Sequence, residues 1–578
     1  MAAPALDPSP SRPLLREGVI VAVLTLVGAI IRLWGLKFLG LVHFDEGTYA
    51  LAGLWSLSPG GLSALDPMVI PYAPPGFPFL VGVSYLFFGA SDIGAIFVSI
   101  LAGTLTIPAT AWLARRTFGA GAGACAAALV ALSGFHIAFS RMALTDASFL
   151  LCWVLGLIAA QRFLERPGIA SATVLGLSVG LAQLFKYNGW LIGAIVILAA
   201  AMGWIVDEKD RARSRLLVLW GSGLLAALVA AAVYWPWYRF VEAHGGYASL
   251  LAHQRRYIGS IHSWLPNLRL QLEQVTALSG GCVWEACVYL LALAGLHLVV
   301  PPWTRRQQIA ALYLVFLTVA FFVLPIFYWI VGVVWMPQLN RWTTGQRVLG
   351  LGWLLLSTLT EFYHPYARLW LPLQHLGWVI LPGLWSLSLS TGEGPPCASG
   401  PVWSNSRALR LLTIVVGLAC LRLVYPLGHP VSFPAPFGSG DLPRPVARSD
   451  SVRIAVKQVL HELPPGIAGL RLLVRPPVTF YLGGRVPAQV EPNLDRLLVS
   501  GNPKFRALVD VAQLRQEKDL ETAKAKLLSR WEIVHEYPTQ LNLPTLLDVD
   551  PGAARSGKSD AATAPLWLLR PRTKGTLP

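Results

Sequence analysis

Two adjacent carboxylates, Asp45 and Glu46, follow directly after the first long apolar run of the chain. At a membrane edge the charged form of a carboxylate is costly to desolvate, so an acidic residue there indicates a function by default. We therefore expect Asp45 and Glu46 to be catalytic residues. The alternative is that Asp45 caps a helix running from Glu46 to Leu57 and binds the free amides of its first turn.

A third carboxylate and three basic residues lie at the ends of later apolar runs. Asp146 is a candidate for a second acidic site or for acceptor binding; otherwise it caps a helix or pairs with Arg141. Lys186 is one of three lysines before residue 450. Lys186, Arg141 and Arg368 are the side chains that can hold a phosphate group as fixed cations. Lys186 and Arg368 can instead extend from the end of a span toward water.

The stretch Pro71–Pro78 is held extended by its prolines and is rich in aromatic residues. From this stretch, and from the residue after Lys186, we expect a cavity lining made of Tyr72, Pro74, Pro75 and Tyr187. The alternative is that these aromatic residues lie at the level of the lipid headgroups, where Trp and Tyr are common in membrane proteins.

The composition indicates what kind of elements must hold these residues. Of 578 residues, 54% are hydrophobic and 13% are charged, which is about half the charged share of a soluble domain. This balance excludes a disordered chain, a disulfide-stapled miniprotein and an ordinary cytosolic enzyme. The net charge of +16 does not indicate nucleic-acid binding, because the basic residues form short clusters between apolar runs.

Eleven apolar runs are long enough to cross a bilayer, which takes about 20 residues. Two shorter runs, Phe77–Gly89 and Val348–Leu359, raise the upper limit to 13 and could be re-entrant or interfacial. The eleven runs are Gly18–Leu39, Asp92–Ala114, Phe118–Phe139, Ala147–Leu164, Ile169–Phe185, Gly189–Val206, Leu216–Tyr238, Ala286–Val300, Ile309–Val331, Leu369–Leu389 and Ala408–Tyr425.

The positive-inside rule orients these spans. If the N-terminal segment is cytoplasmic and the two shorter runs do not cross, every compact basic loop falls on the cytoplasmic side, including Arg115–Arg116, Asp207–Arg215 and Arg305–Arg306. The acidic and basic candidates then lie on the opposite side of the membrane. We therefore expect the chemistry to face away from the cytoplasm.

The fold class that follows is a mainly α polytopic membrane protein with a small C-terminal α/β domain outside the membrane. The predicted divisions are a cytoplasmic segment 1–17, a transmembrane domain 18–425 whose first outer loop is 40–91, a Pro-rich linker 426–450, an α/β domain 451–550 and a disordered tail 551–578.

Within the α/β domain we expect two helices, Ser451–Leu463 and Asp519–Trp531. The predicted strands are Leu470–Val474, Val478–Leu482 and Leu508–Val511. Six scattered cysteines do not form a disulfide framework, although Cys282 and Cys287 share one loop and could bridge.

The acidic pair in Phe44–Ala50 resembles the Asp-Glu motif of the dolichyl-phosphate-mannose protein mannosyltransferase-like group, glycosyltransferase family 39. This group belongs to the GT-C superfamily and includes the lipid A aminoarabinose transferases. Pro74-Pro75-Gly76 resembles its Pro-Pro-Leu segment, with Gly76 as a departure. Ser140–Asp146 is similar to its Ser-Arg-x-x-Leu-x-Asp element.

Two later positions extend the resemblance. Lys186 corresponds to the family's lysine after a pair of spans. Tyr366–Pro372 resembles the Arg-Tyr-x-x-Pro region, with Leu369 where an aromatic residue is common. The resemblance covers residues 15–210 well and 360–390 weakly.

The resemblance implies that a sugar moves from a polyprenyl-phosphate donor to a lipid, glycan or protein acceptor on the outer side of the membrane. Asp45 would deprotonate the acceptor hydroxyl as a general base, and Glu46 would position Asp45 or the acceptor. Lys186, helped by Arg141 or Arg368, would stabilise the leaving phosphate. The anomeric configuration would invert. No cofactor is required, although the three carboxylates could gather a divalent cation. The expected location is the bacterial inner membrane, with the site facing outward.

Two other classes of function remain open at this point. A transporter or lipid flippase could use the same charged residues as a pathway, and inverted repeats, which we do not find, would favour it. A scaffold could recruit envelope enzymes through the C-terminal domain, but that would leave the clustered polar residues unexplained.

Overall fold

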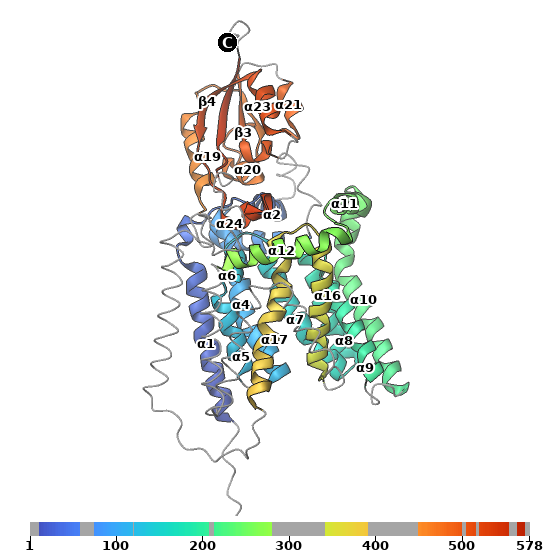
Figure 1. Cartoon of the computed structure of the whole chain (residues 1–578). Coiled ribbons are helices and arrows are strands. Elements are labelled where there is room, and N and C mark those ends of the chain that lie inside the picture. Colours follow the sequence, from blue (N-terminus) through green and yellow to red (C-terminus); the bar gives the residue numbers. More distant parts are fainter. Residues whose placement is uncertain are drawn as a thin grey trace, which may run out of the picture.

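The computed structural model describes residues 11–57, 74–119, 121–206, 213–279, 342–390, 449–499, 504–515, 519–553 and 563–572. A bundle of helices carries a small α/β domain on one end (Figure 1). We call this end of the bundle the domain end and the opposite end the far end. The helices along the bundle are α1 (Ser11–Leu33), α4 (Asp92–Phe118), α5 (Ala122–Leu132), α6 (Gly134–Ser140), α7 (Thr145–Glu165), α8 (Ile169–Phe185), α9 (Leu191–Val206), α10 (Arg213–Ala243), α16 (Thr344–Leu359) and α17 (Leu371–Ser390).

Four helical segments in the described part of the chain are long and apolar enough to cross a membrane: Glu17–Phe38, Asp92–Phe118, Thr145–Glu165 and Ser214–Ala243. The pair α5 and α6, bent by 60°, makes a fifth if it is one span. Helices α8 and α9 are shorter and apolar. Three of the predicted runs lie outside the described residues: Ala286–Val300, Ile309–Val331 and Ala408–Tyr425.

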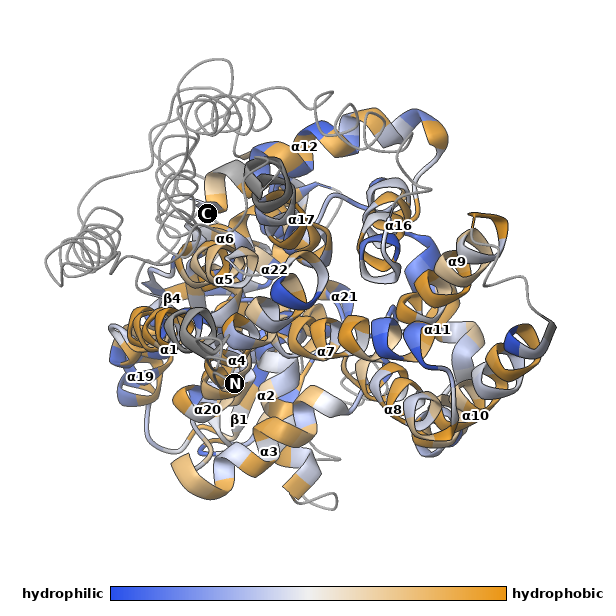
Figure 2. Ribbon diagram, turned by 90° about the horizontal axis from the view of Figure 1, so that it is seen from below, coloured by the Kyte–Doolittle hydropathy of each residue, from blue (hydrophilic) through white to orange (hydrophobic). Residues whose placement is uncertain are grey.

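The peripheral helices expose large hydrophobic side chains. Ile169 on α8 is 78% exposed and Trp220 on α10 is 73% exposed, whereas Trp153 on α7 is fully buried. Hydrophobic residues cover α1, α8 and α10 at the periphery of the bundle (Figure 2). A soluble protein rarely exposes apolar surface on this scale, so this surface is suited to contact with lipid.

Helix α2 (Phe44–Leu57) lies at the domain end (Figure 1), and helix α3 (Gly76–Phe88) packs against it. Gly76 packs against Leu184 near the end of α8, and α3 ends just before Asp92, which contacts the α/β domain. Both ends of α3 therefore lie at the domain end, as expected for a run that does not cross. Two further helices lie there, α11 (Gly246–Arg255) and α12 (Ile261–Ser279).

Helix α16 departs from the sequence-based expectation. Its first turn, at Thr344 and Arg347, lines a pocket with Leu164 at the far end of α7. Its last residue leads into η4 (Thr360–Phe362), where Asn267 of α12 donates to the carbonyl of Glu361. The helix thus passes from the far end to the domain end, contrary to the expectation that Val348–Leu359 does not cross. It is longer than the apolar run because a capping box starts it at Thr343.

The α/β domain is built on a five-stranded sheet with the strand order β2-β1-β3-β5-β4. Strand β1 (Gly469–Leu473) pairs in parallel with β2 (Ala488–Val490) and β3 (Phe505–Asp510). Strand β5 (Leu566–Pro571) pairs antiparallel with β3 and β4 (Trp531–Tyr537), with Leu508 opposite Leu568. The helices are α19 (Ser451–Glu462), α20 (Pro476–Leu482), α21 (Leu494–Leu498), α22 (Val511–Leu514), α23 (Leu520–Leu528) and α24 (Leu543–Val549).

Two expectations for this domain are wrong. The segment Val478–Leu482 belongs to helix α20 and not to a strand, because Pro476 and Pro477 favour a helix start. Residues 563–572 are part of the domain, since β5 lies between β3 and β4. The domain therefore extends past the predicted boundary at residue 550. Strand β5 lacks a polar/apolar alternation because Leu566–Leu569 are all buried.

The α/β domain docks on the bundle mainly through α20 and α2. A Cβ on Gly47 would lie 2.1 Å from the nitrogen of Pro477, so only glycine allows this approach. The guanidinium of Arg475 donates from Nη1 to the carbonyl of Val42 at 2.7 Å, and its Nε lies 2.6 Å from Asp510. The domain thus contacts the backbone next to the acidic pair.

Candidate active site

Asp45 lies in the first turn of α2 and is 4% exposed. Its Oδ2 accepts a hydrogen bond from Nη1 of Arg368, in η5 (Ala367–Trp370) just before α17. Burial lowers the pKa of Arg368, but the carboxylates of Asp45, Asp548 and Asp146 raise it more, so the net shift is upward. Helix capping alone therefore does not describe Asp45, whose carboxylate is half of a buried ion pair.

Glu46 is fully buried and fixes the backbone around the start of α2. Its Oε2 accepts hydrogen bonds from the amides of Val42 and His43, both at 2.9 Å. Its Oε1 accepts one from the amide of Ala143, also at 2.9 Å. Burial raises the pKa of Glu46, while these amides oppose the shift. Glu46 thus ties α2 to the loop between α6 and α7, and so holds Asp45 in place through the backbone.

Asp146 and Lys186 form a second ion pair, with Nζ and Oδ1 2.6 Å apart. Asp146 lies in the first turn of α7 and is 2% exposed, and its Oδ2 has no hydrogen-bond partner among the described residues. Tyr49 of α2 feels the charges of both ion pairs. Burial raises the pKa of its hydroxyl, and the charges of Asp45 and Asp146 raise it further. The predicted acidic and basic positions therefore come together at the domain end, and Asp146 pairs with Lys186 rather than with Arg141.

The α/β domain contributes a site residue that the sequence analysis missed. Asp548 of α24 lies with its Oδ2 2.9 Å from Nε2 of His43 and 3.3 Å from Nε of Arg368. On the other side of the same imidazole, Nδ1 of His43 accepts a hydrogen bond from the amide of Asp45 at 3.0 Å. Nothing in the sequence around Asp548 distinguishes it from an ordinary surface acid; only the docking of the domain places it here.

Arg141 has a different environment from the one expected for a phosphate ligand. Its Nη1 donates to the carbonyls of Ile31, Arg32 and Trp34 at 3.1, 2.9 and 2.6 Å, at the C-terminal end of α1. The side chain is buried, and burial lowers its pKa to about 10. Arg141 therefore binds the last carbonyls of the first span, where a cation also complements the helix dipole.

Two of the predicted lining residues lead into α3. Pro75 is its N-cap, and Pro74 before it is buried. A Cβ on Gly76 would lie 2.7 Å from the carbonyl oxygen of Leu184. The departure of Gly76 from the Pro-Pro-Leu pattern is thus explained by close packing on α8, two residues before Lys186.

The other two residues predicted to line a cavity are Tyr187 and Tyr72. Tyr187 packs edge-on against Tyr247, with ring centroids 6.5 Å apart, and its hydroxyl accepts a hydrogen bond from Trp237 at 3.4 Å. It therefore belongs to an aromatic cluster on α10 and α11 beside Lys186. Tyr72 lies outside the described residues.

A second aromatic cluster lies next to Arg368. Its members, Tyr257, Tyr363, His364 and Tyr366, contact one another through their rings. The guanidinium of Arg368 lies 5.3 Å from the ring centroid of Tyr366, within the range of a cation–π contact. Three of these residues are close to Arg368 in sequence, whereas Tyr257 follows α11 and carried no sequence signal.

Within the described ranges, no group of three or more His, Cys, Asp or Glu side chains is arranged to hold a metal ion. The three carboxylates considered for a cation have other partners here: Arg368 for Asp45, backbone amides for Glu46 and Lys186 for Asp146.

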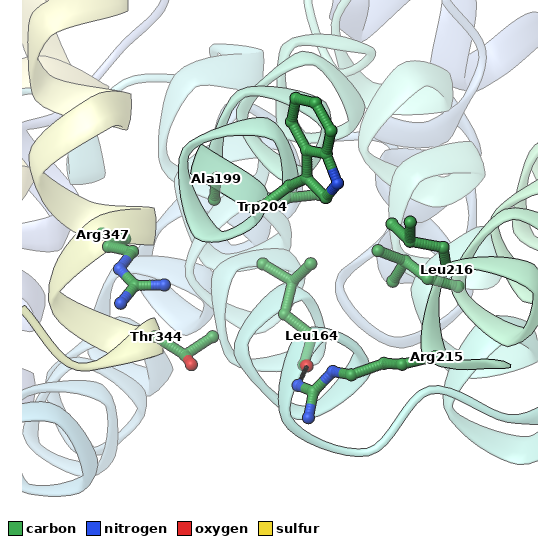
Figure 3. Close-up of a pocket in the computed structure, with 9 residues that line it drawn as sticks. Leu164, Ala199, Trp204, Arg215, Leu216, Thr344 and Arg347 are labelled. Carbon is green, nitrogen blue, oxygen red and sulfur yellow. Dashed lines mark hydrogen bonds between the residues drawn. The ribbon is translucent and has the colours of Figure 1, made fainter. Parts of the chain in front are cut away.

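A separate small pocket lies at the far end of the bundle (Figure 3). It is lined by Leu164, Ala199, Ala200, Trp204, Arg215, Leu216, Leu219, Thr344 and Arg347. Leu164 is about 27 Å along α7 from Asp146, at 1.5 Å per residue. The pocket is therefore distinct from the two ion pairs.

Known proteins share both sequence and fold with the chain. Residues 72–237 match the family model described as dolichyl-phosphate-mannose-protein mannosyltransferase. The whole structure resembles the crystal structure of ArnT from Cupriavidus metallidurans bound to undecaprenyl phosphate, with a TM-score of 0.55, 16% identity, and coverage of 97% of this chain and 98% of ArnT. The chain therefore shares the fold of ArnT, and part of it matches a mannosyltransferase family.

The chain also resembles the oligosaccharyltransferase of Archaeoglobus fulgidus, solved in complex with Zn and sulfate. The TM-score is 0.50 at 14% identity, and the match covers 87% of this chain and 70% of that protein. No curated protein sequence matches the chain. The matches confirm the predicted mainly helical membrane architecture with a C-terminal α/β domain.

Proposed function

We propose that this chain transfers a sugar from a polyprenyl-phosphate donor to an acceptor hydroxyl, at the domain end of the bundle. The observation that carries the proposal is the pair of buried ion pairs, Asp45–Arg368 and Asp146–Lys186, which lie together at this end. They supply a base and two phosphate-binding cations where apolar helices meet a polar domain. The fold shared with ArnT bound to undecaprenyl phosphate supports this donor class.

In the proposed reaction, the acceptor oxygen forms a bond to the anomeric carbon while Asp45 takes the hydroxyl proton. The bond from the anomeric carbon to the phosphate oxygen breaks, and its electron pair stays on the lipid phosphate. Lys186 and Arg368 stabilise the charge that develops on this leaving group. Attack from the face opposite the phosphate inverts the anomeric configuration, and no metal takes part.

The ion pairs also prepare the site for an anionic donor. A bound phosphate can share Lys186 and Arg368 with the carboxylates that they contact here, because an ammonium has three N–H donors and a guanidinium has five. When Arg368 turns part of its charge to the phosphate, Asp45 becomes a stronger proton acceptor. Donor binding and activation of the base are thus coupled through Arg368.

We place the site on the extracytoplasmic side of a bacterial inner membrane, and the charge distribution supports this sidedness. At the far end, α4 ends with Arg115 and Arg116, α7 ends near Arg162, and Arg215 lies near the start of α10. By the positive-inside rule, this basic end faces the cytoplasm. The domain end, with Asp45, then faces outward.

The experiment uses the purified full chain in proteoliposomes with radiolabelled undecaprenyl-phosphate hexoses, N-acetylhexosamines and aminopentoses. The acceptors are envelope lipid, glycan and protein fractions. We expect one donor class to be consumed with transfer of its sugar, and NMR of the product to show inversion. Movement of the labelled lipid across the bilayer without sugar transfer would identify a flippase instead.

A further inference from the structure

Asp45 and three neighbouring residues form a closed ring of hydrogen bonds and ion pairs. The amide of Asp45 donates to Nδ1 of His43 (3.0 Å), and Nε2 of His43 lies 2.9 Å from Oδ2 of Asp548. The same Oδ2 lies 3.3 Å from Nε of Arg368, whose Nη1 donates to the carboxylate of Asp45. The ring therefore holds Asp45 by its backbone and by its side chain.

The ring also fixes the protonation pattern of His43. Because the amide of Asp45 is a donor, Nδ1 must act as an acceptor, so the ring proton of the neutral imidazole lies on Nε2. That N–H then donates to Asp548. A single carboxylate oxygen thus orients both the imidazole and the guanidinium that contact Asp45.

Three members of the ring belong to the membrane part, and the fourth comes from the α/β domain. Asp548 lies on α24, which packs against η5 and α12, and its side chain is 7% exposed. The domain is held to the bundle by other contacts as well, such as Arg453 with Asp92 at 2.7 Å. Docking alone therefore does not require a carboxylate at position 548.

We propose that Asp548 is a positioning residue through which the C-terminal α/β domain completes the active site. This inference rests on the proposed sugar transfer. Asp548 holds Arg368 at the angle from which it reaches both Asp45 and the donor phosphate, and it holds His43 against the start of α2. Without Asp548, the guanidinium and the imidazole lose their common anchor, and Asp45 loses its fixed orientation toward the acceptor.

The test compares Asp548→Asn with two matched controls in the full chain. Asparagine keeps the volume of the side chain and one oxygen that can accept from His43 and Arg368, but it removes the negative charge that attracts the guanidinium. Asp550→Asn removes the same charge from an exposed position two residues away. Arg453→Gln weakens docking at a site outside the ring. Each variant is assayed with the lipid-linked sugar that the wild type transfers, and with undecaprenyl phosphate for binding.

We expect kcat of Asp548→Asn to fall about 10- to 100-fold, the cost of a small misplacement of reacting groups, with the Kd for undecaprenyl phosphate within about threefold of wild type. Both controls should keep kcat near the wild-type value. Normal turnover in Asp548→Asn, or an equal loss in Arg453→Gln, would overturn the positioning role.

A second readout does not depend on transfer. In protein labelled with ¹⁵N-histidine, with His43→Gln used to assign the signal, His43 should show the neutral form with its proton on Nε2. This form should be lost in Asp548→Leu. A different tautomer in the wild type would overturn the inference even if sugar transfer is confirmed, while absence of transfer with this tautomer present would count against the proposed function alone.

Discussion

Asp45 and Arg368 form a buried ion pair although 323 positions separate them in the sequence. Asp45 begins the helix after the first span, and Arg368 precedes α17. The pair therefore joins the segment after the first span to a late span and exists only in the folded bundle. Because Arg368 also contacts Asp548, this one guanidinium connects the membrane part, the α/β domain and the proposed base.

Replacing Lys186 by alanine should weaken binding of undecaprenyl phosphate about tenfold or more, because the site loses a charge-assisted contact. It should also destabilise the protein, since Asp146 is left buried without its partner. The double variant Lys186→Ala/Asp146→Asn should recover thermal stability but not affinity. Binding measured by calorimetry and unfolding measured by light scattering separate the two effects; recovery of affinity in the double variant would argue against phosphate binding by Lys186.

Substituting Arg141 by glutamine should lower the Tm by several degrees and leave the Kd for undecaprenyl phosphate unchanged. The three carbonyls at the end of α1 would lose their charged donor, and hydrogen bonds to charged groups are worth roughly 1.5–3 kcal/mol. The opposite result, weaker donor binding at normal Tm, would support the phosphate contact that the sequence suggested.

Replacing Gly47 by alanine should loosen the α/β domain, because the added Cβ would lie 2.1 Å from the nitrogen of Pro477. The domain should become more sensitive to limited proteolysis, and sugar transfer should fall as Asp548 leaves the site. Gly193→Ala in α9 is the matched control, since a Cβ there meets nothing within 4 Å. Equal protease resistance in both variants would contradict the docking described here.

Stability should depend on pH through Glu361. Burial raises its pKa from the usual value of 4.5 to about 8. Since the folded state favours the neutral form, this contribution to stability is complete below about pH 4.5 and is lost as the pH rises through 8. The Tm of the wild type should therefore fall by a few degrees more than that of Glu361→Gln between pH 6 and 9. Parallel pH profiles for the two proteins would show that Glu361 does not titrate in this range.

The sequence identified the charged positions but not their partners. Asp45, Asp146, Lys186 and Arg368 stood out because charged residues are rare at the ends of apolar runs, and all four lie at the domain end. Pairing depends on which helices are neighbours, and periodicity does not contain that information. The sequence alone therefore offers Arg141, five residues away, as a partner for Asp146. In the structure the partner is Lys186, which lies after the next helix.

In the fold, too, features with a local sequence pattern could be predicted, and features that depend on distant segments could not. Long apolar runs and the helix beginning at Ser451 were predicted because their patterns are local. Strand β5 was missed because it is a short run buried by strands that precede it in sequence. Asp548 was missed for the same reason, since its role depends on where the α/β domain docks.

The most direct test of the central claim is the turnover of Asp45→Asn in proteoliposomes, with donor binding measured separately. Asparagine keeps the shape of the side chain, caps a helix about as well as aspartate, and can still accept a hydrogen bond from Arg368, but it cannot take up the acceptor proton. We predict that kcat falls roughly 100-fold or more, while the Kd for undecaprenyl phosphate and the Tm stay close to those of the wild type. Near-normal turnover in Asp45→Asn would contradict the assignment of Asp45 as the base.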